Sequence, residues 1–122
     1  MKEGLRLFVC GPTVYDYMHI GNARTFSVFD TFVRYLRYIR VRVTYLQNIT
    51  DIDDKIIVRA EREHMTAREI ARHYEKEFKK DVKALHIDSV DRYARATDHV
   101  KEIVRQIQTL IQKGHAYEIP GN

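Results

Sequence analysis

The sequence predicts an α/β fold in which a parallel β-sheet packs against flanking helices. Two strand-like segments, residues 5–10 and 40–46, are separated by a helix-like segment that runs from Ile20 to about Tyr38. Strands joined by such a helical crossover pair in parallel. Between the first strand and the helix lies the string PTVYDYMHIGN, residues 12–22, which is typical of a phosphate-binding turn.

The first three elements each show the periodicity of their type. Residues 5–10 read LRLFVC, and Gly11-Pro12 ends this strand. The first helix carries a buried stripe at spacings of three and four residues, formed by Phe26, Phe29, Val33 and Leu36. Residues 40–46, RVRVTYL, alternate and contain β-branched side chains, so they predict the second strand.

Two further helices are expected in the middle of the chain. Asp53 and Asp54 place carboxylates at the first turn of a helix over residues 53–62. Thr66 and Glu69 have the spacing of a capping box, which opens a helix over 67–84. The apolar stripe of that helix consists of Ile70, Tyr74, Phe78, Val82 and Leu85.

The last third of the chain predicts a connection and one more long helix. Residues 88–96 can include a short third parallel strand. Thr97 is expected to cap the last helix, and Gly114 to end it. Its apolar face consists of Val100, Ile103, Val104, Ile107, Leu110 and Ile111. Residues 116–119 are expected to start a further strand.

Composition indicates one soluble, globular domain. The chain has 122 residues, of which 44% are hydrophobic and 31% charged, and no stretch approaches a membrane span or a signal peptide. A single cysteine cannot form an internal disulfide, which suits a reducing cytoplasm. The net charge of +4 is compatible with a nucleic-acid partner but does not argue for one.

The residues at the start of the first helix predict a nucleotide site. His19, Gly21 and Asn22 lie where backbone N–H groups are unpaired and the helix dipole is positive. Glycine allows a ligand to approach the backbone, while imidazole and amide groups can donate hydrogen bonds to phosphate oxygens. The alternative from the residues alone is that Asn22 caps the helix and His19 packs in a loop.

Two strings resemble the cysteinyl-tRNA synthetases, a family of class I aminoacyl-tRNA synthetases. They are FVCGPTVYDYMHIGNARTF, residues 8–26, and YLQNITDIDDKIIVRA, residues 45–60. The family's HIGH signature corresponds to residues 19–22, with Asn22 at a position where the family also uses Asn. The resemblance covers essentially all 122 residues. It implies a Rossmann-like (HUP-type) parallel sheet with flanking helices, as in the first half of a class I synthetase catalytic domain.

The resemblance also implies how the chain is divided. Residues 1–115 would form the N-terminal half of the nucleotide-binding catalytic domain, and residues 116–122 the start of the connective insertion. The family's KMSKS loop, helical bundle and anticodon-binding domain have no counterpart in these 122 residues. We therefore interpret the chain as an N-terminal fragment and expect it to have little or no activity by itself.

Site residues follow from the match to the family. ATP binding is expected at Pro12, Thr13, His19, Gly21 and Asn22. Of these, His19 and Asn22 would be catalytic, because they would stabilise charge that develops at the α-phosphate. This role is positioning and electrostatics, without covalent catalysis.

Cys10, Gly11 and Thr50 are expected to contact the substrate cysteine. The carboxyl ends of parallel strands, where these residues lie, are where such folds bind ligands. Thr50 has an alternative role as the N-cap of the helix that begins near Asp53. Asn48 and Asp51 are expected to face the same crevice.

Cys10 would also be one ligand of a Zn²⁺ ion that recognises the substrate thiol. Zinc prefers thiolate, so it can select a thiol over a hydroxyl. A lone cysteine in an apolar strand would otherwise be a small buried residue. The family's other ligands have no counterpart here, so we expect little or no zinc in this chain.

The function implied is ATP- and Mg²⁺-dependent formation of cysteinyl adenylate, followed by transfer of cysteine to tRNA(Cys). Cysteine, ATP, tRNA(Cys) and the remainder of the same polypeptide are the expected partners, in the cytoplasm and without a membrane. One alternative is a related ligase whose acceptor is an amino-sugar. The other is a truncated, non-catalytic nucleotide-binding homologue, whose exposed sheet edge and apolar faces would need a partner chain.

Overall fold

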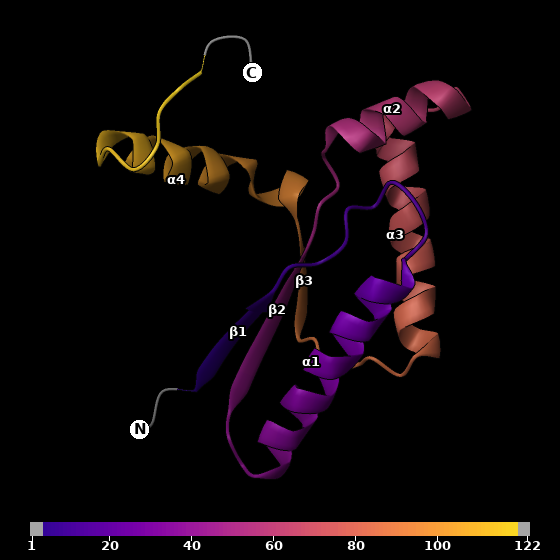
Figure 1. The fold of residues 1–122 in the computed structure, drawn as a ribbon, viewed down its shortest axis with the longest axis vertical. Helices are drawn as coiled ribbons and strands as arrows, with labels where there is room; N and C mark the ends of the chain where they lie inside the picture. The colour runs from indigo at the N-terminus through magenta and orange to yellow at the C-terminus, as the bar shows by residue number, and fades with distance from the viewer. Residues whose placement is uncertain (1–3, 120–122) are drawn as a thin grey trace.

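The structure is a computed structural model that describes residues 4–119, in which helices separate the three strands along the chain (Figure 1). In chain order they are β1 (Leu5–Val9), α1 (Ile20–Tyr38), β2 (Val43–Ile49), α2 (Asp54–Glu63), α3 (Ala67–Ala84), β3 (Arg92–Arg95), the 3₁₀ helix η1 (Ala96–His99) and α4 (Val100–Gln112). Within the described residues, no helix is both long and apolar enough to cross a membrane.

The three strands form one parallel sheet with the order β1-β2-β3. Leu7 pairs with Tyr45 in the first ladder, and Gln47 pairs with Tyr93 in the second. This arrangement confirms the α/β fold and the parallel pairing of the first two strands. The third strand, Arg92–Arg95, lies within the 88–96 connection where the sequence allowed one.

The second strand lies three residues further along the chain than predicted. Residues 40–46 were expected, but β2 begins at Val43 and ends at Ile49. Arg40 has a φ of 64°, so it belongs to the turn after α1 and cannot begin a strand. The polar residues Gln47 and Asn48 indicated the end of the strand. In the structure both belong to β2, and Gln47 is completely buried within it.

One face of the sheet is covered by α1 and α3. Val33 of α1 packs with Val9, Val43 and Tyr45 from β1 and β2. α3 then packs along α1, and its Phe78 ring meets the Phe26 ring edge to face at 5.8 Å. The predicted stripe of α1 is therefore the buried face of the helix.

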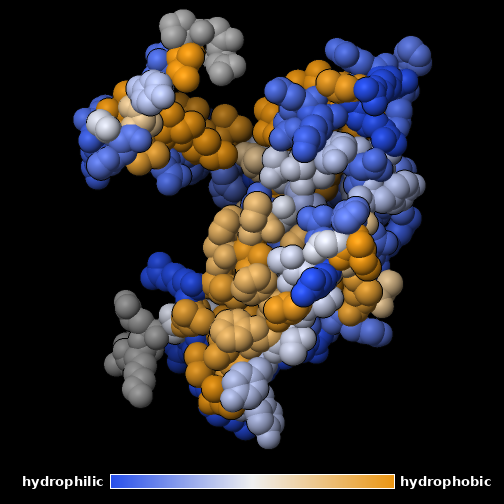
Figure 2. Space-filling view, viewed as in Figure 1, coloured by the Kyte–Doolittle hydropathy of each residue, from blue (hydrophilic) through white to orange (hydrophobic). Residues whose placement is uncertain are grey.

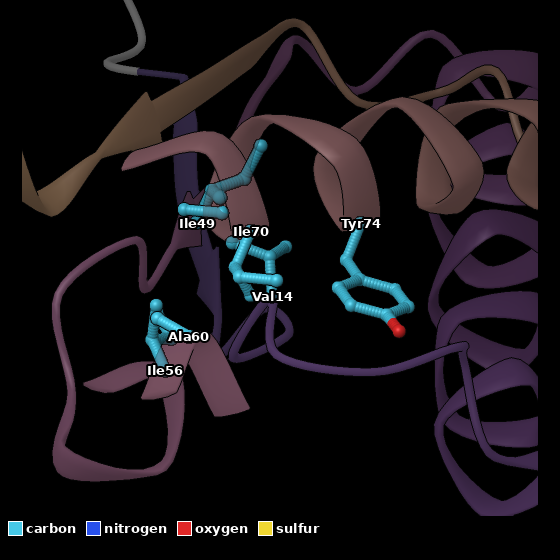
Figure 3. Close-up of a cluster of buried hydrophobic side chains, with 7 residues drawn as sticks. Val14, Ile49, Ile56, Ala60, Ile70 and Tyr74 are labelled. Carbon is cyan, nitrogen blue, oxygen red and sulfur yellow. The ribbon is translucent and has the colours of Figure 1, made fainter. Parts of the chain in front are cut away.

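A second core lies where α2, α3 and the loop after β1 meet (Figure 3). Figure 3 shows apolar side chains from all three segments turned toward one another. The buried members are Val14, Ile49, Ile56, Ala60, Ile70, Ala71 and Tyr74. Because Val14 lies within the PTVYDYMHIGN string and Ile49 ends β2, this core fixes the turn against the end of the sheet.

The last helix differs from its prediction in its start and in its packing. Thr97 does not cap α4: it lies inside η1, and α4 begins at Val100. The predicted apolar face of α4 is between 39% and 48% exposed at its large side chains. Figure 2 shows this face as a hydrophobic surface on α4, which projects away from the sheet in Figure 1.

The end of α4 agrees with the prediction, but the strand after it does not. Gly114 has a φ of 73°, and His115 N donates to Leu110 O across the helix end. A left-handed glycine just after the last turn is how many helices stop. Residues 116–119 have no regular secondary structure, so the strand expected there is absent from the described residues.

Two arginines near the end of α1 form ion pairs with aspartates in residues 88–91, the segment before β3. Arg34 pairs with Asp30 and Asp88, and Arg37 pairs with Asp91 at 2.7 Å. The two arginine side chains are still 48% and 36% exposed, so these are ion pairs at the protein surface. Arg40 and Arg42, between α1 and β2, are exposed as well.

Candidate functional site

The candidate site lies at the carboxyl ends of β1 and β2. Beyond these ends the chain continues to pair, because Thr50 N donates to Pro12 O at 2.9 Å and Val14 N donates to Thr50 O at 3.1 Å. Thr13 and Thr50 form an isolated parallel bridge. The two segments with the family resemblance are therefore held side by side by backbone hydrogen bonds.

Asn48 connects the residues expected to contact the amino acid. Its Oδ1 accepts a hydrogen bond from Gly11 N at 2.8 Å, and its Nδ2 donates to Thr50 Oγ1 at 3.0 Å. Both ends of the Asn48 amide are thus used inside the protein. Asn48 therefore positions Gly11 and Thr50, while Oδ1 can accept and Nδ2 can donate one further hydrogen bond each.

Gly11 is required by a close approach of two backbone segments. A Cβ atom at this position would lie 1.7 Å from Asn48 O and 2.9 Å from the carbonyl carbon of Asn48. Both contacts are with backbone atoms, which cannot rotate away as a side chain can. Glycine therefore allows β1 to turn into the site directly beside β2.

His19 is the N-cap of α1. Its Nδ1 accepts a hydrogen bond from Gly21 N at 3.0 Å, and its backbone is extended. Because Nδ1 is the acceptor, the neutral imidazole carries its proton on Nε2, where it can donate to a ligand. The cap is therefore His19, and the alternative in which Asn22 caps the helix is wrong.

Asn22 and the first turn of α1 add further donors. Asn22 is exposed, and within residues 4–119 its side-chain amide has no hydrogen-bond partner. The first turn of α1 contains no acidic residue, so nothing in it opposes an anion. This helix entry presents N–H donors to the solvent side of the site.

A polar cavity of about 260 Å³ brings these residues together. Pro12, Thr13, His19 and Asn22 line it, as does Gly11. Cys10, Gly21 and Thr50 are not among the lining residues, although each adjoins one in the chain or by hydrogen bonding. The cavity therefore groups four of the five expected ATP-binding residues with Gly11, one of the three residues expected to contact cysteine.

Several lining residues were not predicted to form the site. Lys55 comes from α2 and Phe78 from α3, and Asp16, Tyr17 and Met18 complete the turn. Lys55 lies in residues 45–60, the second string that resembles the cysteinyl-tRNA synthetases, so the sequence did contain an indication that this residue is near the site. Phe78 had no such signal, because only the packing of α3 on α1 brings it to the turn.

Thr50 does not cap the next helix. The N-cap of α2 is Asp53, whose Oδ1 accepts from Lys55 N at 2.9 Å. Thr50 precedes this cap and uses its hydroxyl with Asn48. Asp54 lies in the first turn of α2, as predicted, whereas Asp53 precedes the helix as its cap.

Asp51 does not face the crevice. It is 8% exposed, and its carboxylate accepts hydrogen bonds from Thr97 N, at 2.9 Å, and from Thr97 Oγ1. Asp51 also borders a second cavity of about 430 Å³ between α2, α3 and η1. Its carboxylate joins the site loop to the start of η1.

Replacing Asp51 with alanine should cost about 2 kcal/mol of unfolding free energy, because Thr97 loses both partners and its N–H stays unsatisfied. Asp51→Asn keeps one acceptor oxygen and should cost about half as much. Urea unfolding measures the loss, and amide hydrogen exchange should rise first in η1 and at the start of α4. Unchanged exchange there in Asp51→Ala would show that this contact does not hold η1.

Cys10 is exposed directly after β1, so its alternative role as a small buried residue is wrong. Within residues 4–119, no group of three or more His, Cys, Asp or Glu side chains could hold a metal ion. The described residues therefore offer a single cysteine thiol and do not fit a complete zinc site.

The family described as "tRNA synthetases class I (C) catalytic domain" matches residues 1–122. A curated cysteine–tRNA ligase of Latilactobacillus sakei subsp. sakei (strain 23K) is 49% identical over 123 residues. That match covers 100% of this chain and 26% of the relative. The chain thus spans about a quarter of the length of the relative.

Solved structures of Mycobacterium tuberculosis methionyl-tRNA synthetase have a similar fold. One, bound by methionyl-adenylate, superposes with a TM-score of 0.78 at 22% identity, over 88% of this chain and 22% of that one. A second, in complex with methionyl-adenylate, gives 0.73 at 26% identity, over 86% and 22%. The likeness confirms the Rossmann-like arrangement. Together with the match over the whole sequence, it shows that this chain belongs to the class I (C) tRNA synthetase catalytic-domain family.

Proposed function

We propose that this chain supplies the ATP- and cysteine-binding half of a cysteine–tRNA ligase. The observation that carries the proposal is that Pro12, Thr13, His19 and Asn22 line one polar cavity at the entry of α1. The name of the 49% identical relative supports cysteine as the amino acid and tRNA as the acceptor. It favours tRNA over an amino-sugar acceptor.

The geometry suggests how the nucleotide would be bound. The N–H groups of the first turn of α1, the Nε2–H of His19 and the Asn22 amide would donate hydrogen bonds to phosphate oxygens. Negative charge grows on the α-phosphate when the amino-acid carboxylate attacks it. Donors fixed in advance at that point stabilise the transition state more than the ground state.

The amino acid would lie beside the nucleotide, at the ends of β1 and β2. Gly11 and Thr50 are held there by Asn48, and Cys10 is exposed next to them. A methionyl-tRNA synthetase of similar fold is described in complex with methionyl-adenylate, an aminoacyl adenylate. By analogy, we place cysteinyl adenylate across these two sets of residues.

Several parts of this proposal reach beyond the described residues. Cys10 would be one ligand of a zinc ion whose other ligands lie elsewhere in the complete protein. Mg²⁺ would accompany ATP, and tRNA(Cys) would bind the whole enzyme, in the cytoplasm. Residues 116–122 would begin the connective insertion.

ATP–pyrophosphate exchange that depends on cysteine is the direct test. We expect little or no exchange by this chain alone, but measurable binding of Mg·ATP. His19→Ala and Asn22→Ala should each weaken ATP binding about tenfold, because each removes a donor to a charged phosphate. Ser27→Ala, elsewhere on α1, is the matched control and should bind like the wild type.

Two results would contradict the proposal. One is ATP binding that is unaffected by both His19→Ala and Asn22→Ala. The other is exchange that proceeds with serine as well as with cysteine. Cysteine-dependent exchange by the chain alone would keep the assignment as a ligase but would overturn the expectation that these 122 residues are inactive.

A further inference from the structure

Lys55 lines the candidate nucleotide cavity together with His19 and Asn22, although it comes from a different helix. It is the second residue of α2, and its backbone N donates to the Asp53 carboxylate at 2.9 Å. This cap fixes the first turn of α2 and therefore the point from which the Lys55 side chain starts. The cavity thus has α1 on one side and a cation from α2 on another.

The charge of Lys55 is not neutralised by the protein. Within the part of the chain that the structure describes, no carboxylate lies within 4 Å of its ammonium group. The ammonium lies 5.4 Å from the centroid of the Tyr15 ring, and Tyr15 also lines the cavity. A cation–π contact holds an ammonium without cancelling its charge.

The other charges near the cavity are already paired. Asp16, the acidic lining residue, lies 3.3 Å from Arg59 Nη1. Arg59 also pairs with Glu63 and donates to the Tyr74 hydroxyl. Lys55 therefore remains as the uncompensated cation among the described residues that line this cavity.

We propose that Lys55, which reaches the cavity from α2, binds the polyphosphate of the nucleotide together with the entry of α1. This inference rests on the proposed function and adds a residue to it. The N-terminus of α1 provides neutral donors and a partial positive charge, whereas Lys55 provides a full charge. An ammonium attracts the phosphates and not the uncharged adenosine, so its contribution can be separated from that of the rest of the ligand.

The test compares three probes on the 122-residue chain: Mg·ATP, adenosine and inorganic tripolyphosphate, each titrated by calorimetry or by NMR shifts. Lys55→Ala should weaken ATP and tripolyphosphate about tenfold and leave adenosine within about twofold. Lys55→Arg should keep most of the affinity, because it keeps the charge. Lys76→Ala, at an exposed lysine of α3, is the matched control.

The outcomes separate this inference from the proposed function. If Lys55→Ala binds ATP like the wild type while His19→Ala does not, the role of Lys55 is overturned and the nucleotide site stands. Equal weakening of ATP and adenosine would also overturn it, because it would indicate a change in the cavity. If the wild-type chain binds neither ATP nor tripolyphosphate, both proposals fail for this chain.

Discussion

Replacing Gly11 with alanine should produce the largest loss of stability of any single methyl addition to the site. The new Cβ would lie 1.7 Å from Asn48 O, so β1 and β2 would have to separate where they enter the site. Overpacking a close contact usually costs 1–3 kcal/mol, and a clash with backbone cannot be relieved by a rotamer change. We expect a loss of about 3 kcal/mol or more, measured by urea unfolding followed by circular dichroism.

Gly114→Ala is the control for this prediction. Gly114 has a φ of 73° but no heavy atom within 4 Å of the added methyl group. It should therefore lose only about 1 kcal/mol, the cost of a left-handed backbone for alanine. If Gly11→Ala lost no more than Gly114→Ala, the two strand ends would have to be further apart than the structure shows.

The second large effect is expected at Glu75 of α3. This carboxylate is 3% exposed and accepts hydrogen bonds from Arg72, Lys79 and Arg95, at distances between 2.7 and 2.9 Å. Burial by itself raises the pKa of Glu75, but the hydrogen bonds from these cations outweigh burial and lower the pKa to about 2. Arg95 ends β3, so the cluster joins α3 to the sheet.

The direction of the pH effect follows from that lowered pKa. A carboxyl group with a lower pKa in the folded chain stabilises the fold above its unfolded pKa of about 4.5. The contribution should fall as the pH drops from about 4.5 to about 2. We expect Glu75→Gln to cost about 2–3 kcal/mol at pH 7, because three cations then surround a neutral group. The difference from the wild type should disappear near pH 2.

Urea midpoints measured from pH 7 to pH 2 test this prediction, with Glu77→Gln as the matched control. Glu77 lies on the same helix and pairs with Lys80 alone at 2.7 Å. Its substitution should leave the urea midpoint at pH 7 nearly unchanged, as for surface ion pairs. A Glu75→Gln loss that is equal at pH 7 and pH 2 would show that the effect comes from packing and not from charge.

Local patterns were enough to predict most of the helices. The α1 stripe and the capping box of α3 depend on residues within one or two turns, so their bounds agree with the structure within about one residue. The turn at residues 12–22 was found in the same way, because a strand, a glycine-proline stop and a helix entry follow one another directly. Much of the candidate site is built from this one continuous segment.

Contacts between distant segments could not be predicted in this way. Gln47 continues β2 although it is polar, because it lies buried between two neighbouring strands. Asp51 looked like a crevice residue, yet its carboxylate is used by Thr97, 46 positions away in the chain. Neither the burial of Gln47 nor the partner of Asp51 can be predicted from the residues next to it in the sequence.

The sequence by itself determined the class of fold, the helix entry with His19 and Asn22, and the family. Only the tertiary structure decided that His19 caps α1, that Asp51 accepts hydrogen bonds from Thr97 of η1, that Cys10 is exposed, and that Lys55 of α2 lines the same polar cavity as His19 and Asn22. The physical reason is that helix and strand propensities act over a few neighbouring residues. The partner of a carboxylate or an ammonium, in contrast, depends on which distant segments the packing of the core brings together.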